Sequence, residues 1–155
     1  MHPNCAAVDA VLEASGARGR VQLLPDAAPT AAAAAAQLGV DVGAIANSLV
    51  FATDEGDPVL IMTSGAHRVD TVKVAALLGA ANLNRATPDL VLRATGQPIG
   101  GVAPVAHPAP LRTIVDVTLA GYPEIWAAGG IPHAVFPTTY DELLRLTAGR
   151  PAEVA

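Results

Sequence analysis

Residues 100–108, with the sequence GGVAPVAHP, combine two glycines, two prolines and a histidine. The adjacent glycines let a backbone approach a ligand closely, because no Cβ stands in the way. Pro104 fixes its own φ, and Pro108 biases His107 toward an extended conformation. Such a segment could offer rigid backbone N–H groups to a substrate. A tight turn between a helix and a strand explains the same glycines, and on these residues alone it is the better explanation.

Few side chains suggest acid–base or nucleophilic catalysis. His107 could act as a general base, because imidazole titrates near neutral pH, but a substrate-lining or structural role is the preferred interpretation. Ser48 has no nucleophile-elbow signature around it, which favours hydrogen bonding or the positioning of a water over covalent catalysis. The four histidines lack His-x-x-x-His spacing and Cys5 is the only cysteine, so neither a metal site, another cofactor nor an internal disulfide is expected.

The composition indicates one domain with few aromatic side chains for its core. Just over half of the 155 residues are hydrophobic, yet there are only two Phe, two Tyr and one Trp. Ala, Val, Leu and Ile must therefore fill the core. The alanine run 31–36 is too short to cross a bilayer, and no basic, apolar leader is evident, so a cytoplasmic protein without a membrane partner is expected.

Hydrophobic periodicity and punctuation by Gly and Pro predict a mixed α+β domain over residues 1–149. Asn4 is the expected cap of the first helix, and residues 150–155 are expected to form a loose tail. Asp54–Asp57 is the expected turn of a hairpin. Helices are predicted to begin near residues 4, 30, 70, 87 and 139, and strands to cover 20–24, 48–53, 59–63, 112–117, 125–128 and 134–136.

Four stretches in this order resemble the YbaK/prolyl-tRNA synthetase-associated editing domain family, the free-standing aminoacyl-tRNA deacylases. They are Asn47–Phe51 (NSLVF), Arg68–Lys73 (RVDTVK), Gly100–Pro108 and Trp126–His133 (WAAGGIPH). The resemblance spans roughly residues 40 to 145. It implies a mixed, barrel-like sheet flanked by helices, with a substrate cleft at one side.

The resemblance also implies site residues. Backbone N–H groups of Gly100 and Gly101, with the following turn, would stabilise the oxyanion, and Ser48 would line the cleft. The other residues implied to contact the substrate are Asn47, Val102, Pro104, Ala106, His107, Gly129 and His133. The aspartate at position 116 would orient the loop, or else lie at a solvated strand end.

Two residues depart from the family pattern. Asn47 stands where the family usually has a lysine that helps to hold the end of the substrate, and Ala106 stands where the loop usually has a second glycine. Asn47 could replace the lysine as a neutral hydrogen-bonding group or simply begin a strand. Ala106 would alter the geometry of the loop.

The expected activity is the deacylation of mischarged aminoacyl-tRNA that carries a small amino acid, on tRNA-Pro or a related acceptor. DNA is not an expected partner. The net charge of −5 is unusual for a protein that acts on tRNA, because phosphates are usually neutralised by Lys and Arg. Either only the aminoacylated end is held, or an aminoacyl-tRNA synthetase supplies further contacts. The alternatives are a non-catalytic relative that binds an aminoacyl-tRNA end or a nucleotide-like ligand, and a small-ester hydrolase that uses His107 as its base.

Overall fold

The computed structural model describes residues 1–155, which form five α-helices and eight β-strands. The helices are α1 (Pro3–Ala14), α2 (Ala31–Leu38), α3 (Thr71–Leu78), α4 (Pro88–Thr95) and α5 (Tyr140–Thr147). The strands are β1 (Gln22–Leu23), β2 (Ile45–Thr53), β3 (Pro58–Ser64), β4 (Leu83–Arg85), β5 (Arg112–Asp116), β6 (Ile125–Ala128), β7 (Ala134–Thr138) and β8 (Arg150–Ala152). Two short 3₁₀ helices, η1 (Val42–Ala44) and η2 (Val117–Gly121), precede β2 and follow β5.

Local sequence signals explain where most helices begin and end. The side chains of Thr30, Asp70, Thr87 and Thr139 each accept a hydrogen bond from the backbone N–H three residues further on. Helices α2, α3 and α4 end at glycines in the left-handed conformation. The predicted cap of α1 is wrong. His2 Nδ1 accepts from the N–H of Asn4, because the proline at position 3 already opens the first turn.

The strands form one mixed sheet in the order β1-β7-β6-β2-β3-β5-β8, with β4 paired to β2 outside this path. The β2–β3 hairpin is antiparallel from Ala46↔Ser64 to Ala52↔Pro58, as predicted. Parallel pairs join β2 to β6, β3 to β5 and β5 to β8. The α+β class and the mixed sheet are confirmed, although the sheet remains an open path and does not close into a complete barrel.

The last six residues are not a loose tail. Arg150–Ala152 form β8 beside β5, and Val154 is completely buried under α3. The N–H of Asp70 donates to the carbonyl of Val154, and Lys73 Nζ donates to the carbonyl of Ala155. The sequence lacked a strand signal here because only three residues pair and one of them is a proline.

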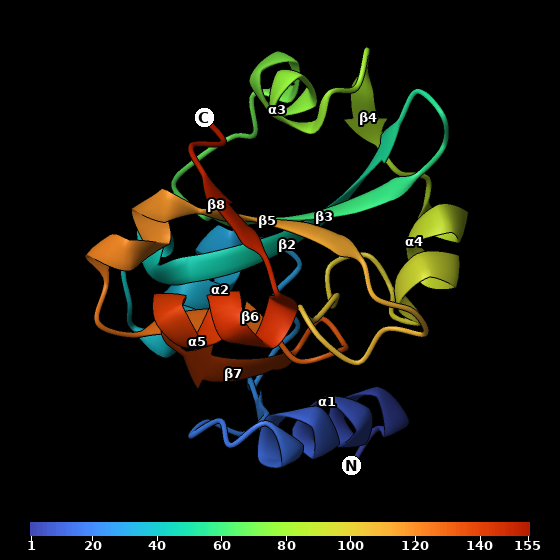
Figure 1. The fold of residues 1–155 in the computed structure, drawn as a ribbon. Coiled ribbons are helices and arrows are strands. Elements are labelled where there is room, and N and C mark those ends of the chain that lie inside the picture. Colours follow the sequence, from blue (N-terminus) through green and yellow to red (C-terminus); the bar gives the residue numbers. More distant parts are fainter.

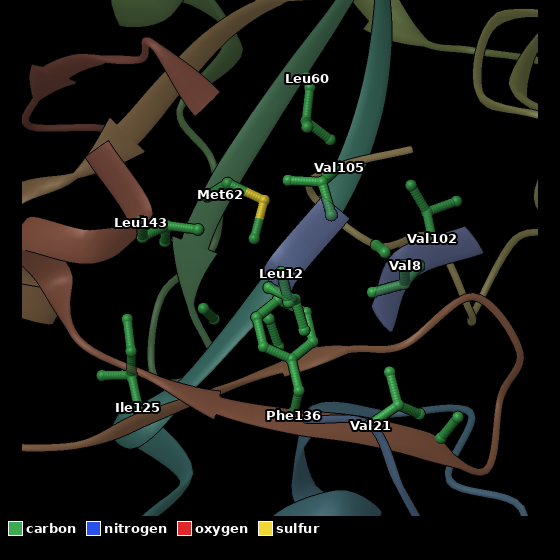
Figure 2. Close-up of a cluster of buried hydrophobic side chains, with 14 of the residues drawn as sticks. Val8, Leu12, Val21, Leu60, Met62, Val102, Val105, Ile125, Phe136 and Leu143 are labelled. Atoms are coloured by element: carbon green, nitrogen blue, oxygen red, sulfur yellow. The ribbon is translucent and has the colours of Figure 1, made fainter. Parts of the chain in front are cut away.

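The largest core cluster fixes the segment that the sequence singled out. Val102, Ala103 and Val105 are buried together with Leu12 of α1 and Phe136 of β7. Figure 2 shows Val102 and Val105 beside the side chains of α1 and β3. Residues 102–105 are therefore part of the hydrophobic core, and the loop is held by burial as well as by hydrogen bonds.

The remaining elements cover the sheet from both ends. Figure 1 places α1 and the N-terminus at one end of the molecule, and α3, β4 and the C-terminus at the other. Smaller apolar clusters lie under α3 and under α2. No helix of the fold has the length and apolar character that a bilayer crossing requires.

Candidate active site

The cavity beside the middle of β2, termed the main cavity, opens where one edge of this strand has no neighbouring strand. On this edge β6 pairs with Ile45 and Ala46, and β4 pairs with Phe51 to Thr53. The four residues between them, 47–50, have no strand partner on that side, and all four line a cavity of about 290 Å³. A cavity of this size suits a small ligand or the end of a larger one.

Five parts of the chain wall this cavity. They are the start of α2 with the preceding loop, the middle of β2, the region from β4 to α4, the start of the glycine loop, and the β6–β7 hairpin. Most of the wall is small and apolar, with many alanines. The side chains with polar groups are Thr30, Asn47, Ser48, Arg85 and Trp126.

Asn47, expected to bind the substrate, and Ser48, expected to position the reactants, both line the cavity. Successive side chains of a strand point to opposite faces, but both can contact a ligand when the cavity lies at the strand's edge. Ser48 Oγ lies 3.2 Å from Met62 Sδ, a weak acceptor. The Ser48 hydroxyl therefore remains able to hydrogen-bond a ligand. No imidazole or carboxylate contacts it, so nothing activates it as a nucleophile.

The two glycines of the loop have different roles. Gly100 adopts φ of 87° and lines the cavity. A Cβ on Gly101 would lie 2.5 Å from the Cα of Ile131, so a glycine is needed for the loop to pack against the β6–β7 hairpin. Gly101 does not line the cavity, and its N–H donates to the carbonyl of Pro98 at 3.0 Å. It is a structural residue of the turn.

The N–H groups of Gly100 and Val102 are the free donors of this loop at the main cavity. Neither has a hydrogen-bond partner within the protein, whereas the N–H of Gly101 and that of Ala103 both do. Gly100 and Val102 also line the cavity, and Gly101 and Ala103 do not. At the cavity the loop thus has two unpaired backbone donors, whereas the N–H groups of Gly101 and Ala103 hold the shape of the loop.

Gln97 holds the loop in this shape. Its Oε1 accepts from the N–H of Ala103 at 2.6 Å, and its Nε2 donates to the carbonyls of Val105 and Ala106 at 3.1 and 3.4 Å. The side chain is buried, with 3% of its surface exposed. Sequence reasoning missed this residue, because a lone glutamine after a helix carries no recognisable signal.

Pro104, Ala106 and His107 lie outside the main cavity. They line a second cavity of about 330 Å³ between the loop, α1 and the end of α5. The core position of Val105 turns the chain away after Val102, which places these three residues on the other side of the loop. They were expected to contact the substrate, and the structure does not bring them to the same cavity as Asn47 and Ser48.

His107 is held by the backbone. Its Nε2 lies 2.8 Å from the carbonyl oxygen of Ala103, which can only accept, so Nε2 carries the hydrogen. Burial lowers the pKa of His107 below its usual 6.5, and the bond to Ala103 opposes this only in part. The imidazole is therefore mainly neutral near pH 7, and it does not reach the main cavity where it could serve as a base.

Gly129 and His133 support the cavity without lining it. The N–H of Gly129 donates to the carbonyl of Ala134, and the carbonyl of His133 accepts from the N–H of Leu24. Their neighbours Ala128 and Pro132 form the wall instead. Both predicted residues thus shape the hairpin that carries the wall.

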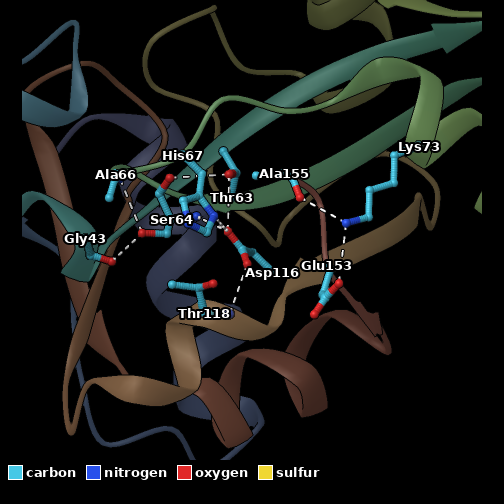
Figure 3. Close-up of polar contacts among 10 residues, drawn as sticks. All are labelled: Gly43, Thr63, Ser64, Ala66, His67, Lys73, Asp116, Thr118, Glu153 and Ala155. Atoms are coloured by element: carbon cyan, nitrogen blue, oxygen red, sulfur yellow. Dashed lines mark hydrogen bonds and ion pairs between the residues drawn. The ribbon is translucent and has the colours of Figure 1, made fainter.

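Asp116 and His67 form a separate polar cluster (Figure 3). Asp116 is buried and accepts from the N–H groups of Ser64 and Thr118, and His67 Nδ1 lies 2.9 Å from its Oδ2. The aspartate joins the ends of β3 and β5, and its hydrogen bonds reach no residue of the glycine loop. Neither the orienting role nor the solvated strand end suggested by the sequence is correct. No three His, Cys, Asp or Glu side chains gather where a metal ion could bind.

Two further lining residues were not identified as site residues from the sequence. Arg85, on β4, is the only charged residue of the cavity wall. Trp126, on β6, has a buried Nε1 without a hydrogen-bond partner. The short β4 was not predicted, so Arg85 had no assigned place. Trp126 lies within one of the motif stretches, but an aromatic residue is common in a strand, so it was not identified as a site residue.

The sequence and the fold are similar to those of several known proteins. The family model of the aminoacyl-tRNA editing domain matches residues 25–146. The proline–tRNA ligase of Geobacter sp. (strain M21) is 34% identical over 87 residues, which are 56% of this chain and 15% of the ligase. That of Nitratidesulfovibrio vulgaris (strain DP4) is 37% identical over 84 residues, or 54% of this chain and 14% of the ligase. The chain thus spans a small part of these relatives. A crystal structure described as a candidate trans-editing enzyme for prolyl tRNA synthetase superimposes with a TM-score of 0.92 and 42% identity, over 99% of this chain and 98% of the other.

Proposed function

Because this chain belongs to the aminoacyl-tRNA editing domain family, we propose that it hydrolyses the ester of mischarged aminoacyl-tRNA as a separate, trans-acting enzyme. The observation that carries the proposal is the pair of unpaired N–H groups on Gly100 and Val102 at the wall of a mainly apolar cavity. The similarity to a candidate trans-editing enzyme over nearly all of both chains supports a separate enzyme. The proline–tRNA ligases among the relatives favour tRNA-Pro as the acceptor.

In this proposal the loop stabilises the transition state. Water adds to the ester carbonyl carbon, and negative charge develops on the carbonyl oxygen. The N–H groups of Gly100 and Val102 donate to this oxyanion, and because Gln97 and the core fix the loop, little reorganisation is needed. The bond from carbon to the ribose oxygen then breaks, the ribose oxygen takes up a proton, and the free amino acid leaves.

The cavity wall holds no carboxylate, imidazole, thiol or lysine that could accept the proton of the attacking water. We therefore assign this step to the substrate itself, through the ribose hydroxyl beside the ester. Asn47 and Ser48, at the unpaired edge of β2, orient the ribose and the water by hydrogen bonds. The protein positions the reactants and stabilises charge, which are large contributions to catalysis in general.

Arg85 and Ile99 hold the nucleotide end at the rim. Arg85 is exposed, and Ile99 is an apolar side chain with 47% of its surface exposed. A guanidinium suits a phosphate and an exposed aliphatic side chain suits a base, so together they fit the terminal nucleotide of a tRNA. The net charge of −5 argues against a wide tRNA footprint, and contacts beyond the acceptor end would come from a partner synthetase.

A non-catalytic binding role is the second candidate, favoured by the neutral Asn47 in place of the family's usual lysine. Two measurements separate the candidates. Binding of an amide-linked, non-hydrolysable aminoacyl-adenosine is measured by calorimetry, and hydrolysis of the matching aminoacyl-tRNA is measured with wild type and Asn47→Lys. Binding with turnover by wild type supports the deacylase. Saturable binding without turnover by wild type would establish the binding role, and turnover by Asn47→Lys alone would show that the lost lysine is the cause.

A further inference from the structure

Arg85 makes a cation–π contact with Phe51. The Cζ atom of Arg85 lies 5.6 Å from the centroid of the Phe51 ring. The two residues are cross-strand partners in the antiparallel pair of β2 and β4, so their side chains lie on the same face of the sheet. A guanidinium this close to an aromatic ring is attracted by the electron-rich face of the ring. The position of the Arg85 guanidinium is therefore linked to that of the ring.

The Phe51 ring is a fixed platform for this contact. Only 3% of the surface of Phe51 is exposed, and the residue packs in the apolar cluster under α3 with Val59, Ile61 and Leu83. A side chain in a close-packed interior has little freedom to change its rotamer. Arg85, in contrast, is exposed. The buried ring thus restrains the exposed side chain, and not the reverse.

The Arg85 side chain donates no hydrogen bond within the protein, which distinguishes it from most of the other arginines. Five of these donate from the side chain to a backbone carbonyl or a carboxylate, namely Arg20, Arg93, Arg112, Arg145 and Arg150. No carboxylate forms an ion pair with Arg85. A cation–π contact pairs no N–H group with an acceptor. The N–H donors of Arg85 therefore remain available for a phosphate.

Resting on the proposed binding of the tRNA end by Arg85, we propose that Phe51 is a positioning residue that keeps the Arg85 guanidinium ready for the phosphate. A free arginine side chain has many rotamers, and a ligand that binds only one arrangement loses affinity in proportion to the fraction of protein in the others. The ring favours one arrangement before tRNA binds. Phe51 itself does not line the cavity, so it acts on affinity through Arg85.

A double-mutant cycle tests this inference. The affinity for uncharged tRNA-Pro at low salt is measured for wild type, Phe51→Leu, Arg85→Gln and the variant with both substitutions. A cation–π contact at an exposed site favours the held arrangement by about twofold to fivefold. Phe51→Leu should therefore weaken binding by about this factor when Arg85 is present, and by much less in the Arg85→Gln background. Equal weakening in the two backgrounds would overturn the inference, as would an affinity that Phe51→Leu leaves unchanged.

Val59→Ala is the matched control for lost core packing. Val59 pairs with Phe51 from β3, belongs to the same cluster and is buried. Both Phe51→Leu and Val59→Ala should lower the free energy of unfolding, but only Phe51→Leu should weaken tRNA binding. Phe51→Met, which removes the ring and fills the space with a flexible apolar side chain, should act on binding as Phe51→Leu does. If Val59→Ala weakened binding as much as these variants, packing would explain the effect and the inference would be wrong.

The cycle is independent of the deacylase function because it follows binding and not hydrolysis. Coupled weakening by the two substitutions supports the inference even if no ester is hydrolysed and the deacylase function fails. Hydrolysis by wild type, together with an affinity that does not depend on Phe51, would overturn the inference alone. A wild-type protein that binds no tRNA would also overturn it.

Discussion

The side-chain carbonyl of Gln97 accepts a hydrogen bond of 2.6 Å from the backbone N–H of Ala103. This bond, and the two that the Gln97 amide donates, satisfy buried backbone groups of the loop with a single side chain. The neighbouring N–H of Val102 remains unpaired. The bond therefore uses the N–H of Ala103 within the loop, next to the free N–H of Val102.

Replacing Gln97 should damage both stability and catalysis. Gln97→Leu keeps the side chain large but removes the partner of two buried backbone groups, at Ala103 and Val105, and of the half-buried carbonyl of Ala106. We expect the free energy of unfolding to fall by about 1–3 kcal/mol, the usual cost of a buried unsatisfied polar group. We expect kcat to fall at least tenfold while KM changes less, because the donors would move out of position. Denaturant unfolding and steady-state deacylation measure the two effects.

Gln37→Leu is the matched control. Gln37 also makes two hydrogen bonds to backbone groups, both of Asp26, but at the surface of α2. It should lower kcat by much less than Gln97→Leu does. Equal losses of kcat in the two variants would show that Gln97 has no particular role in positioning the loop.

Replacing Ala106 with glycine should stabilise the protein. It is one of two non-glycine residues with positive φ, at 67°, and it stands where the family usually has glycine. The left-handed conformation costs an alanine about 1–2 kcal/mol, and the greater freedom of glycine in the unfolded chain offsets about half of that. We expect Ala106→Gly to raise the free energy of unfolding by about 0.5–1 kcal/mol. Ala109→Gly, in the same segment without positive φ, should lower it instead. A loss of stability in Ala106→Gly would contradict this account.

Arg85 should contribute to tRNA affinity more than to the chemical step. Arg85→Gln removes the only cation of the cavity wall, and we expect KM to rise roughly fivefold with little change in kcat. The slope of log affinity against log salt should fall by about 0.7–0.9, the value for one phosphate contact. Binding of tRNA is measured over a range of salt concentrations.

Arg93→Gln makes the same change of charge on α4, where Arg93 is exposed and paired with Asp89. It should leave KM and the salt slope nearly unchanged. If Arg93→Gln weakened tRNA binding as much as Arg85→Gln, the effect would reflect net charge rather than a contact at the cavity.

His107 should make the protein less stable in acid. Its folded pKa is lowered by burial, so below the usual 6.5 the unfolded chain binds the proton more readily than the folded protein does. Stability due to this group is therefore fully present at higher pH. It is lost as pH falls through 6.5 toward the folded pKa. His107→Gln keeps a donor for the Ala103 carbonyl but does not titrate.

Unfolding free energies of wild type and His107→Gln are compared from about pH 8 to about pH 5. Wild type should lose more stability than the variant below about pH 6.5, while both retain activity near neutral pH. Parallel pH profiles would refute the lowered pKa. A complete loss of hydrolysis in His107→Gln would instead restore the imidazole as a candidate base.

Much of the fold and part of the site could be predicted from the sequence. The elements that were predicted depend on local residues, and those that were missed depend on residues distant in sequence. The helix caps Thr30, Asp70, Thr87 and Thr139 act on their own next turn, so local sequence reveals them. The resemblance to the editing family, which rested on whole motifs, is confirmed by the family match. In contrast, β4 and β8 are three-residue strands that depend on partners distant in sequence, and their residues carry no strand pattern.

The same distinction explains the site. Asn47, Ser48, Gly100 and Val102 were identified because they lie in the motifs, and they meet at one cavity. The motif does not indicate that the chain passes into the core at Val105. This passage places His107 at the second cavity, away from the main one. The contacts of Gln97 and the orphaned N–H of Trp126 are tertiary features, and only the folded chain shows them.

The most direct test of the central claim is single-turnover hydrolysis of a panel of tRNA-Pro species charged with alanine, cysteine, serine, threonine or proline. Wild-type protein in excess is mixed with each species, and the remaining ester is followed over time beside a sample without protein. We expect at least one mischarged species to be hydrolysed much faster than it decays spontaneously, while prolyl-tRNA-Pro is spared. Spontaneous rates for all five species would contradict the assignment of this cavity as a deacylase site.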